Sequence, residues 1–478
     1  MLNKLRKAAL AAAAAATLIA CGNFDVTNPN QPTLDDLLAN PTRAKLSAAA
    51  TGLFARSRSE ITSLIWRLGS MGREGINLAG NNQPDYQEPY FGPLSPSGFG
   101  GALWQSRYGL IRDANTYLEA LSHTTALSSG EKAVSQAMAE TLKALAFMYI
   151  IETRGKLGAP VDVGSAIDAP PAPFVSEDSV YGYAIGLLSD AFTKLQANAS
   201  AAFPFPLPPG FTGFDTPGTF ASFVTALLGK ANVLRATAGC GGACYRSALS
   251  ALNATFIDTT DPATLERGVY FDFSNRPGDQ SNDLSEPLNG VRYFADSLIL
   301  YQKVQFNGAT PDRRLTSKTA IATADAPQSI PGVDITGTLK FVNYFTNGSP
   351  NPSHPIPIIK NEELILLRAE AEWFATTPNR AQAVADLNYV RVNSGGLTPV
   401  PGLTGASSDA AFINALLYER EFSLLWEQGT TWIDARRFKV LNTIPLGVTN
   451  GNVPGIMPIP AAECSARRLG GTCNPLGG

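Results

Sequence analysis

Paired carboxylates are the residues in this sequence whose types and spacing come closest to a reaction site. Examples are Asp35 with Asp36, Glu362 with Glu363, and Glu370 with Glu372. Two carboxyl groups on either side of a glycosidic bond act as acid and base in glycoside hydrolysis. Each pair, however, falls at the start or on the face of a predicted helix, where solvated charge is the usual explanation. The sequence therefore favours surface charge over a hydrolase site.

Other patterns of catalytic residues are missing from the sequence. The two histidines, His123 and His354, have no partners at the spacing of a metal site or a catalytic triad. No Gly-x-Ser-x-Gly motif occurs, and Gly229-Lys230 lacks the upstream glycine of a phosphate-binding loop. We therefore predict a protein that is not an enzyme, with no catalytic residue, no metal site and no cofactor.

Four of the five cysteines form two local pairs, Cys240 with Cys244 and Cys464 with Cys473. Four cysteines allow three disulfide connectivities. We expect the local pairing, because both pairs flank glycine-rich turns and the chain begins with an apparent export signal that leads to an oxidising compartment. A four-cysteine zinc site is the alternative, but structural zinc prefers shorter spacers than these.

Apolar residues recur at helical spacing through most of the chain. They predict helices over 104–122, 131–153, 179–197, 220–238, 245–256, 361–376 and 379–393. The last two helices form a hairpin of about 33 residues, close to the tetratricopeptide period of 34. Stacked hairpins bury their apolar faces against their neighbours. We therefore expect a mainly α fold of tetratricopeptide-like stacked helical hairpins.

Three segments interrupt the helical pattern, namely 73–101, 201–218 and 258–360. They are rich in proline and glycine and contain a few short strand-like runs. Long loops in a compact protein are usually functional, so we expect these loop-rich insertions, rather than the helices, to form a ligand surface. A nucleic-acid ligand is not expected, because the net charge is −3 and no basic cluster extends over a helix length.

Residues 412–438 predict an amphipathic helix, a break at Gly429 and a short second helix. The pattern Glu419-Arg420, Trp426-Glu427-x-Gly429 and Trp432-x-Asp434-x-Arg436-Arg437 resembles the C-terminal signature of the SusD/RagB family of outer-membrane nutrient-binding lipoproteins. Further motifs resemble the family in the same order along the chain: Asn28-Pro29-Asn30, the helix from Trp104 to Leu118, the segment from Ile358 to Ala371, Leu387-Asn388-x-Val390-Arg391, and Pro458-Ile459-Pro460 followed by Asn474-Pro475. Ser423 and Thr431 depart from the signature.

The resemblance implies a function. Family members are lipoproteins that sit as a lid on a SusC-like TonB-dependent transporter, capture oligosaccharides or peptides outside the cell and deliver them to the channel without catalysis. The helical repeats would then face the transporter, and the loop-rich face would hold the ligand. A helical-repeat scaffold for outer-membrane assembly and a surface hydrolase are the alternatives.

The N-terminus is predicted to be a lipoprotein signal peptide over residues 1–20. Lys4, Arg6 and Lys7 precede an apolar stretch that is too short to span a bilayer. The run Leu18-Ile19-Ala20-Cys21 is similar to a bacterial lipobox, so Cys21 would be acylated and anchor the mature chain to the outer membrane. Residues 21–478 would form a single body. An ordinary secretory signal is the alternative, and the residues after Cys21 leave the side of the membrane open.

The segment 81–100 combines aromatic rings with amides. Flat rings cover the C–H face of a sugar, and amides bind its hydroxyl groups. The candidate ligand-binding residues are Asn81, Asn82, Tyr86, Tyr90, Phe91 and Phe99. The alternative for any of these rings is packing beneath its own loop. Tyr293, Tyr344 and Phe345 are the next candidates.

Overall fold

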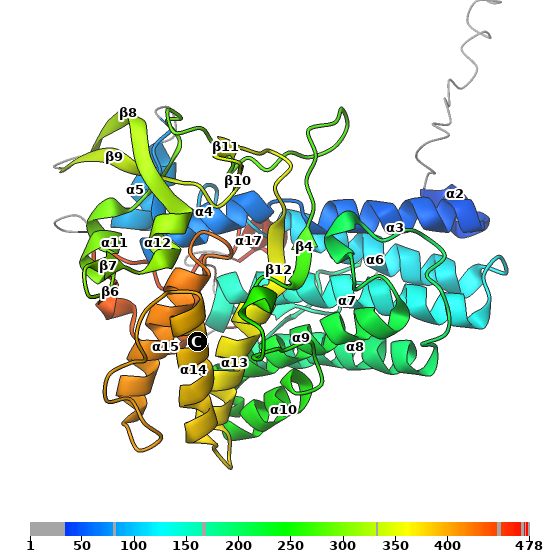
Figure 1. Ribbon diagram of the computed structural model, residues 1–478. Helices are drawn as coiled ribbons and strands as arrows, with labels where there is room; N and C mark the ends of the chain where they lie inside the picture. The colour runs from blue at the N-terminus through cyan, green and yellow to red at the C-terminus, as the bar shows by residue number, and fades with distance from the viewer. Residues whose placement is uncertain are drawn as a thin grey trace, which may run out of the picture.

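Long helices laid side by side form most of the molecule in the computed structural model (Figure 1). The structure describes residues 34–79, 83–164, 169–330, 333–446, 451–469, 473 and 475–476, with the backbone alone for 34–36, 325–330 and 333–336. The helices of this stack are α3 (Arg43–Ser57), α4 (Ile61–Gly72), α6 (Gln105–His123), α7 (Ser129–Arg154), α8 (Glu177–Ala197), α9 (Pro217–Arg235), α10 (Gly242–Leu252), α13 (Asn361–Phe374) and α14 (Arg380–Asn393). Each helix from α6 to α10 packs against the next, and α13 packs against both α10 and α14. The prediction of a mainly α fold of stacked hairpins is confirmed.

Local sequence signals explain where several of these helices begin. Ser128 caps α7, and Glu131 completes a capping box that satisfies two N–H groups at the helix end. Thr216 caps α9 in the same way, with Pro217 at the first helical position. The residues of α7 after Thr141 are buried all round, because α6 and α8 pack on either side of it. Burial between neighbours, rather than helix propensity alone, therefore stabilises the stack.

Two disulfides staple short loops. Cys240 ends a π-helical turn after α9 and is bonded to Cys244 in α10, with the Cα atoms 5.7 Å apart. Cys464 in α17 (Ala461–Ala466) is bonded to Cys473, with the Cα atoms 5.8 Å apart. These are the two local pairs that the spacing of the cysteines predicted. By the chain-entropy argument each bond stabilises the fold by roughly 2–3 kcal/mol.

A layer of short strands and helices covers one end of the stack, at the upper left of Figure 1. We call residues 75–101 and 268–360 the inserted layer. Its strand pairs are antiparallel: β1 (Gly75–Asn77) with β5 (Tyr293–Ala295), β4 (Gly268–Phe271) with β12 (Ile356–Lys360), β6 (Phe306–Asn307) with β7 (Thr310–Pro311), β8 (Thr319–Ile330) with β9 (Val333–Phe341), and β10 (Phe345–Thr346) with β11 (Ser349–Pro350). Outside this layer, β2 (Ala159–Pro160) pairs with β3 (Phe174–Val175).

The inserted layer contains helices that the sequence did not predict. They are α5 (Gln83–Phe91), α11 (Ser297–Lys303) and α12 (Arg313–Lys318). The expectation of an irregular loop over 73–101 is therefore wrong for α5. This helix contains Pro89, and its buried Tyr86 and Tyr90, one turn apart, pack with Phe294 in a small core cluster. Contacts with a segment distant in sequence stabilise a helix whose local composition disfavours it.

The C-terminal helices follow the predicted pattern of helix, break and helix. α15 (Asp409–Ser423) and α16 (Thr430–Arg437) are separated by a turn at Gly429, whose φ is +66°. A Cβ atom at this position would lie 2.2 Å from the Cβ of Leu68, so both conformation and space require glycine. Over the described residues, no helix combines the length and apolar character needed to cross a membrane.

Candidate functional site

Two aromatic rings project from the inserted layer. Among the described residues, Tyr301 and Phe306 are the aromatic side chains classed as exposed, at 53% and 56%. Tyr301 shares one face of α11 with Leu298, three residues earlier, and Phe306 begins β6. Ile321 in β8 is exposed as well. We call Leu298, Tyr301, Phe306 and Ile321 the aromatic platform.

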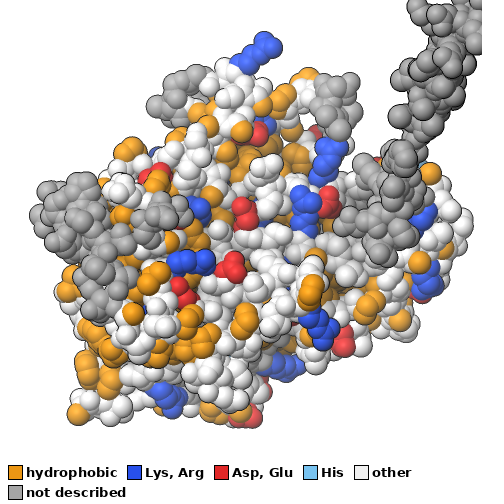
Figure 2. All heavy atoms as spheres, turned by 90° about the horizontal axis from the view of Figure 1, so that it is seen from above, with side chains coloured by type: hydrophobic (Ala, Val, Ile, Leu, Met, Phe, Trp, Pro, Cys, Tyr) orange, Lys and Arg blue, Asp and Glu red, His pale blue; other side chains and the backbone are white. Residues whose placement is uncertain are grey.

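The elements that carry these residues, α11, β6 and β8, lie at the left-hand end of the molecule in Figure 1. Seen from above, hydrophobic side chains are spread over this face and are numerous at its lower left (Figure 2). Basic and acidic side chains are interspersed over the same face, without a large patch of one sign. Exposed apolar groups that gather in this way mark binding surfaces.

Amide residues are the sequence neighbours of both exposed rings. Gln302 follows Tyr301, and Gln305 and Asn307 stand on either side of Phe306. The Asn307 Nδ2 group donates a hydrogen bond to the carbonyl oxygen of Gly396, 3.1 Å away. Rings beside planar hydrogen-bonding groups are the combination that covers the apolar face of a sugar and binds its hydroxyl groups.

A buried polar network fixes α11 to α5. Asp296 caps α11 by accepting from the backbone N–H of Ile299, and its other carboxylate oxygen accepts from the Tyr90 hydroxyl at 2.9 Å. The Arg73 guanidinium lies 3.9 Å from the centre of the Tyr90 ring. Burial raises the pKa of both Tyr90 and Asp296. Tyr90 therefore supports the helix that presents Tyr301.

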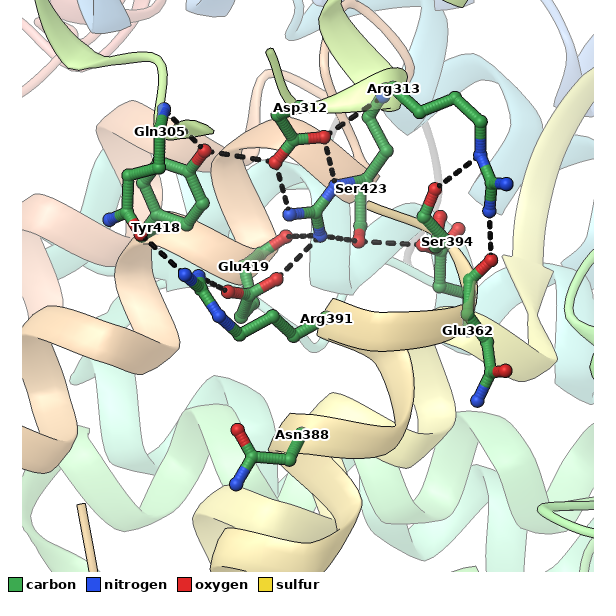
Figure 3. A network of polar contacts seen from close by, with 12 residues as sticks. Gln305, Asp312, Arg313, Glu362, Asn388, Arg391, Ser394, Tyr418, Glu419 and Ser423 are labelled. Atoms are coloured by element: carbon green, nitrogen blue, oxygen red, sulfur yellow. Dashed lines mark hydrogen bonds and ion pairs between the residues drawn. The ribbon is translucent and has the colours of Figure 1, made fainter. Parts of the chain in front are cut away.

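A second network holds the segment that bears Phe306 (Figure 3). The Gln305 backbone N–H donates to the Tyr418 oxygen at 3.0 Å, and the Gln305 side-chain oxygen accepts from Arg391 Nη2 at 2.7 Å. The Tyr418 hydroxyl donates to Asp312 at 2.9 Å. Residues of α14 and α15 thus fix the backbone immediately before Phe306.

The same network contains a buried cluster of charges between the inserted layer and the C-terminal helices. Glu419 forms ion pairs with Arg314 and Arg391, each at 2.7 Å, and Arg314 also pairs with Asp312 at 2.6 Å. Burial alone lowers the pKa of Arg314, but the adjacent carboxylates of Glu419 and Asp312 raise it above the ordinary value. Ser423, one of the departures from the sequence signature, accepts a hydrogen bond from Arg314. These ion pairs therefore hold the inserted layer, which carries the platform, against the C-terminal helices.

A groove of about 980 Å³ lies beside β4. Residues 209–214, 266–279 and 353–355 line it, so it is formed by two of the insertions predicted from the sequence. Its wall includes Tyr270, and Arg276 and Asn275 supply polar groups. The groove is a second surface on which a ligand could bind.

Three of the predicted ligand-binding rings are buried in the structure. Tyr86, Tyr90 and Phe99 are only 1%, 2% and 2% exposed. Tyr86 and Tyr90 pack in the small core cluster, and Phe99 meets Trp66 edge to face at 5.6 Å. The expectation that these three rings stack on a ligand is therefore wrong, because other side chains cover them.

The remaining predicted ligand-binding residues have different outcomes. Phe91 is half-buried against the same small cluster. Asn81 and Asn82, like the proposed lipid anchor Cys21, lie outside the described residues. The next candidates, Tyr293 and Tyr344, are buried, and Phe345 is half-buried.

Sequence reasoning missed the two exposed rings. The segment 258–360 was expected to contribute to a ligand surface, but Tyr301 and Phe306 were not singled out. Each ring stands next to an amide, in Tyr301-Gln302 and in Gln305-Phe306-Asn307. This adjacency of aromatic and amide residues is the local signal that could have identified them.

Three of the paired carboxylates are buried, whereas Glu372 is half-buried and the side chains of Asp35 and Asp36 lie outside the described residues. Glu362, Glu363 and Glu370 are at most 1% exposed. Glu363 pairs with Lys230 at 3.0 Å, and Glu370 pairs with Arg437 at 2.5 Å. The prediction of solvated charge is therefore wrong for these three residues, because they compensate buried cations. Within the described part of the chain, no group of three potential metal ligands occurs.

Comparison with known proteins identifies the fold. No family model and no curated protein matches the sequence. A SusD superfamily protein from Parabacteroides distasonis superposes with a TM-score of 0.65 at 17% identity, over 88% of this chain and 97% of the other. A SusD-like carbohydrate-binding protein from Bacteroides fragilis gives a TM-score of 0.59 at 16% identity, over 84% and 87%. A laminarin-binding SusD-like protein gives 0.60 at 15% identity, over 89% and 98%. The stacked helices, the inserted layer and these superpositions together show that this chain has the fold of the SusD superfamily.

Proposed function

We propose that this protein is a non-catalytic SusD/RagB-family lipoprotein that captures glycans outside the cell. In this proposal Cys21 carries the lipid, the outer membrane holds the protein, and a SusC-like TonB-dependent transporter receives the ligand. The SusD superfamily fold supports the family assignment, together with the sequence motifs that resemble the family in order. A peptide ligand is the alternative to a glycan.

The observation that supports glycan binding most directly is the pair of exposed rings at Tyr301 and Phe306. A soluble protein exposes such rings at a cost, because water must solvate their apolar faces. Stacking on a pyranose removes those faces from water. Two of the structurally similar proteins are described as binding carbohydrate and laminarin. Laminarin is therefore the first glycan to test.

Replacing Tyr301 or Phe306 with alanine should weaken glycan binding by about 1–2 kcal/mol per ring that stacks on the ligand. The melting temperature should change little, because both rings are exposed and contribute little to the core. Affinity gel electrophoresis with a panel of polysaccharides, followed by calorimetry on those that bind, would measure the effect. Val392→Ala, an exposed apolar residue of α14, is the matched control.

The result also distinguishes the two candidate surfaces. Normal binding by both Tyr301→Ala and Phe306→Ala, with loss of binding in Asn275→Ala or Arg276→Ala, would place the ligand in the groove beside β4 instead of on the platform. Binding of peptides in place of polysaccharides, with the same sensitivity to Tyr301, would keep the site and change the ligand class.

Changing Cys21 to serine should move the protein from the membrane fraction to the soluble exported fraction. The lipid would be the attachment, since two or more acyl chains are needed for stable anchoring. Fractionation of cells that lack the transporter, with a high-salt wash, would test this prediction. Retention of Cys21→Ser in the washed membrane would contradict the lipoprotein assignment.

A further inference from the structure

A cavity of about 420 Å³ lies within the helical stack, outside the inserted layer. It is bordered by the turn after α7 at Lys156, by α8 at Glu177 and Tyr181, by the end of α9 at Leu234, and by α16 at Ile433 and Arg436. Its volume lies in the range of pockets that bind small molecules. Its lining combines apolar side chains with five charged ones.

Arg436 lines this cavity and is held by two neighbouring groups. Its guanidinium lies 4.5 Å from the centre of the Trp432 ring, and Nη2 donates to the carbonyl oxygen of Glu152. The Nη1 atom is shielded from solvent and has no hydrogen-bond partner in the described part of the chain. Arg436 is nevertheless a lining residue of the cavity, so its guanidinium places a positive charge at the wall with which an anionic oxygen could pair.

The charges around the cavity are unbalanced. Lys156 and Lys439 line it, are exposed and form no ion pair within the described residues. Arg437 also lines it, but Glu370 and Asp434 neutralise this cation. Glu177 is the carboxylate at the cavity, and burial raises its pKa. Three cations therefore remain against one carboxylate, which favours an anionic ligand.

Arg436 and Glu177 both line the cavity, and this pair of groups narrows the expected chemistry of a ligand further. Glu177 forms no ion pair in the described residues, although Arg436 is the cation that acts on it. A bound molecule with a carboxylate for Arg436 and a hydroxyl group for Glu177 would satisfy both groups. The apolar walls, including Leu234 and Ile433, would contact its carbon skeleton.

We propose that this cavity binds a small hydroxylated carboxylate, of about the size of an acidic monosaccharide, with its carboxylate on Arg436. The site goes beyond the capture of glycan at the inserted layer and does not depend on it. Its lysines at the rim would attract the anion, and the fixed guanidinium would orient it by charge-assisted hydrogen bonds.

Calorimetry on the purified protein with glucuronate, and with glucose as the neutral counterpart, tests the proposal. Glucuronate should bind saturably and glucose should not. Arg436→Lys keeps the charge but removes the guanidinium, and should weaken glucuronate binding at least tenfold. Lys156→Gln and Lys439→Gln, which change exposed side chains and spare the core, should each weaken it several-fold. Arg467→Gln, a basic residue lining a different cavity, should bind normally.

Several outcomes would overturn the proposal. They are equal binding of glucose, binding of inorganic phosphate in preference to glucuronate, no binding of glucuronate at millimolar concentration, or unchanged affinity in both lysine variants. Because the lysine variants are expected to fold, a folding defect in the Arg436 variant does not prevent the test. Tyr301→Ala should retain glucuronate binding, so failure of the glycan site and failure of this site are distinguishable.

Discussion

Replacing Glu419 with alanine should destabilise the protein by about 3–5 kcal/mol, the cost of breaking a buried ion pair from one side. Glu419 is fully buried; its carboxylate accepts a hydrogen bond from Arg391 and forms an ion pair with Arg314. Its removal leaves Arg391 without its ion-pair partner and Arg314 with Asp312 alone. Chemical denaturation followed by circular dichroism would measure the loss of stability.

The matched control is Glu119→Ala, which removes an exposed glutamate from α6 and should change stability by no more than about 0.5 kcal/mol. Glu419→Ala should also weaken glycan binding, because Arg391 fixes Gln305 next to Phe306. A change in stability as small as that of the control would show that the cluster is dispensable. Unchanged glycan affinity in a folded Glu419 variant would show that the network does not position the platform.

Truncating Trp432 to alanine should cost about 3–5 kcal/mol, as for other large buried aromatic residues. The Trp432 side chain is fully buried in the main core, and its indole N–H donates to the carbonyl oxygen of Pro454 at 2.6 Å. Alanine would leave a cavity beneath Arg436 and an unpaired carbonyl group. The free energy of unfolding, measured by denaturant titration, tests this expectation.

Two other aromatic residues provide a graded comparison with Trp432. Tyr301→Ala should leave stability nearly unchanged, because that ring is exposed. Tyr86→Ala should destabilise the fold, because the structure buries this residue in the small core cluster. Similar stability changes for Trp432→Ala and Tyr301→Ala would contradict the assignment of one residue to the core and the other to the binding surface.

The sequence by itself determined the features that depend on residues close together along the chain. Apolar residues at helical spacing located α6 to α10, α13 and α14 but not α3 and α4, and Gly429 marked the break between α15 and α16. Helix periodicity and a left-handed turn residue are local signals, so they could be read without the fold. The spacing of the cysteines likewise predicted both disulfides.

Only the tertiary structure decided which side chains are exposed. Tyr86 and Tyr90 resemble surface residues of a loop, but they pack with Phe294, about 200 residues later in the chain. Glu419 and Glu363 look like charge on helix faces until Arg314 and Lys230 are brought against them. Burial of a side chain depends on contacts with residues from distant segments of the chain. The local spacing of residues does not predict those contacts. For this reason the sequence located the scaffold and its insertions, whereas the fold selected Tyr301 and Phe306 as the exposed rings.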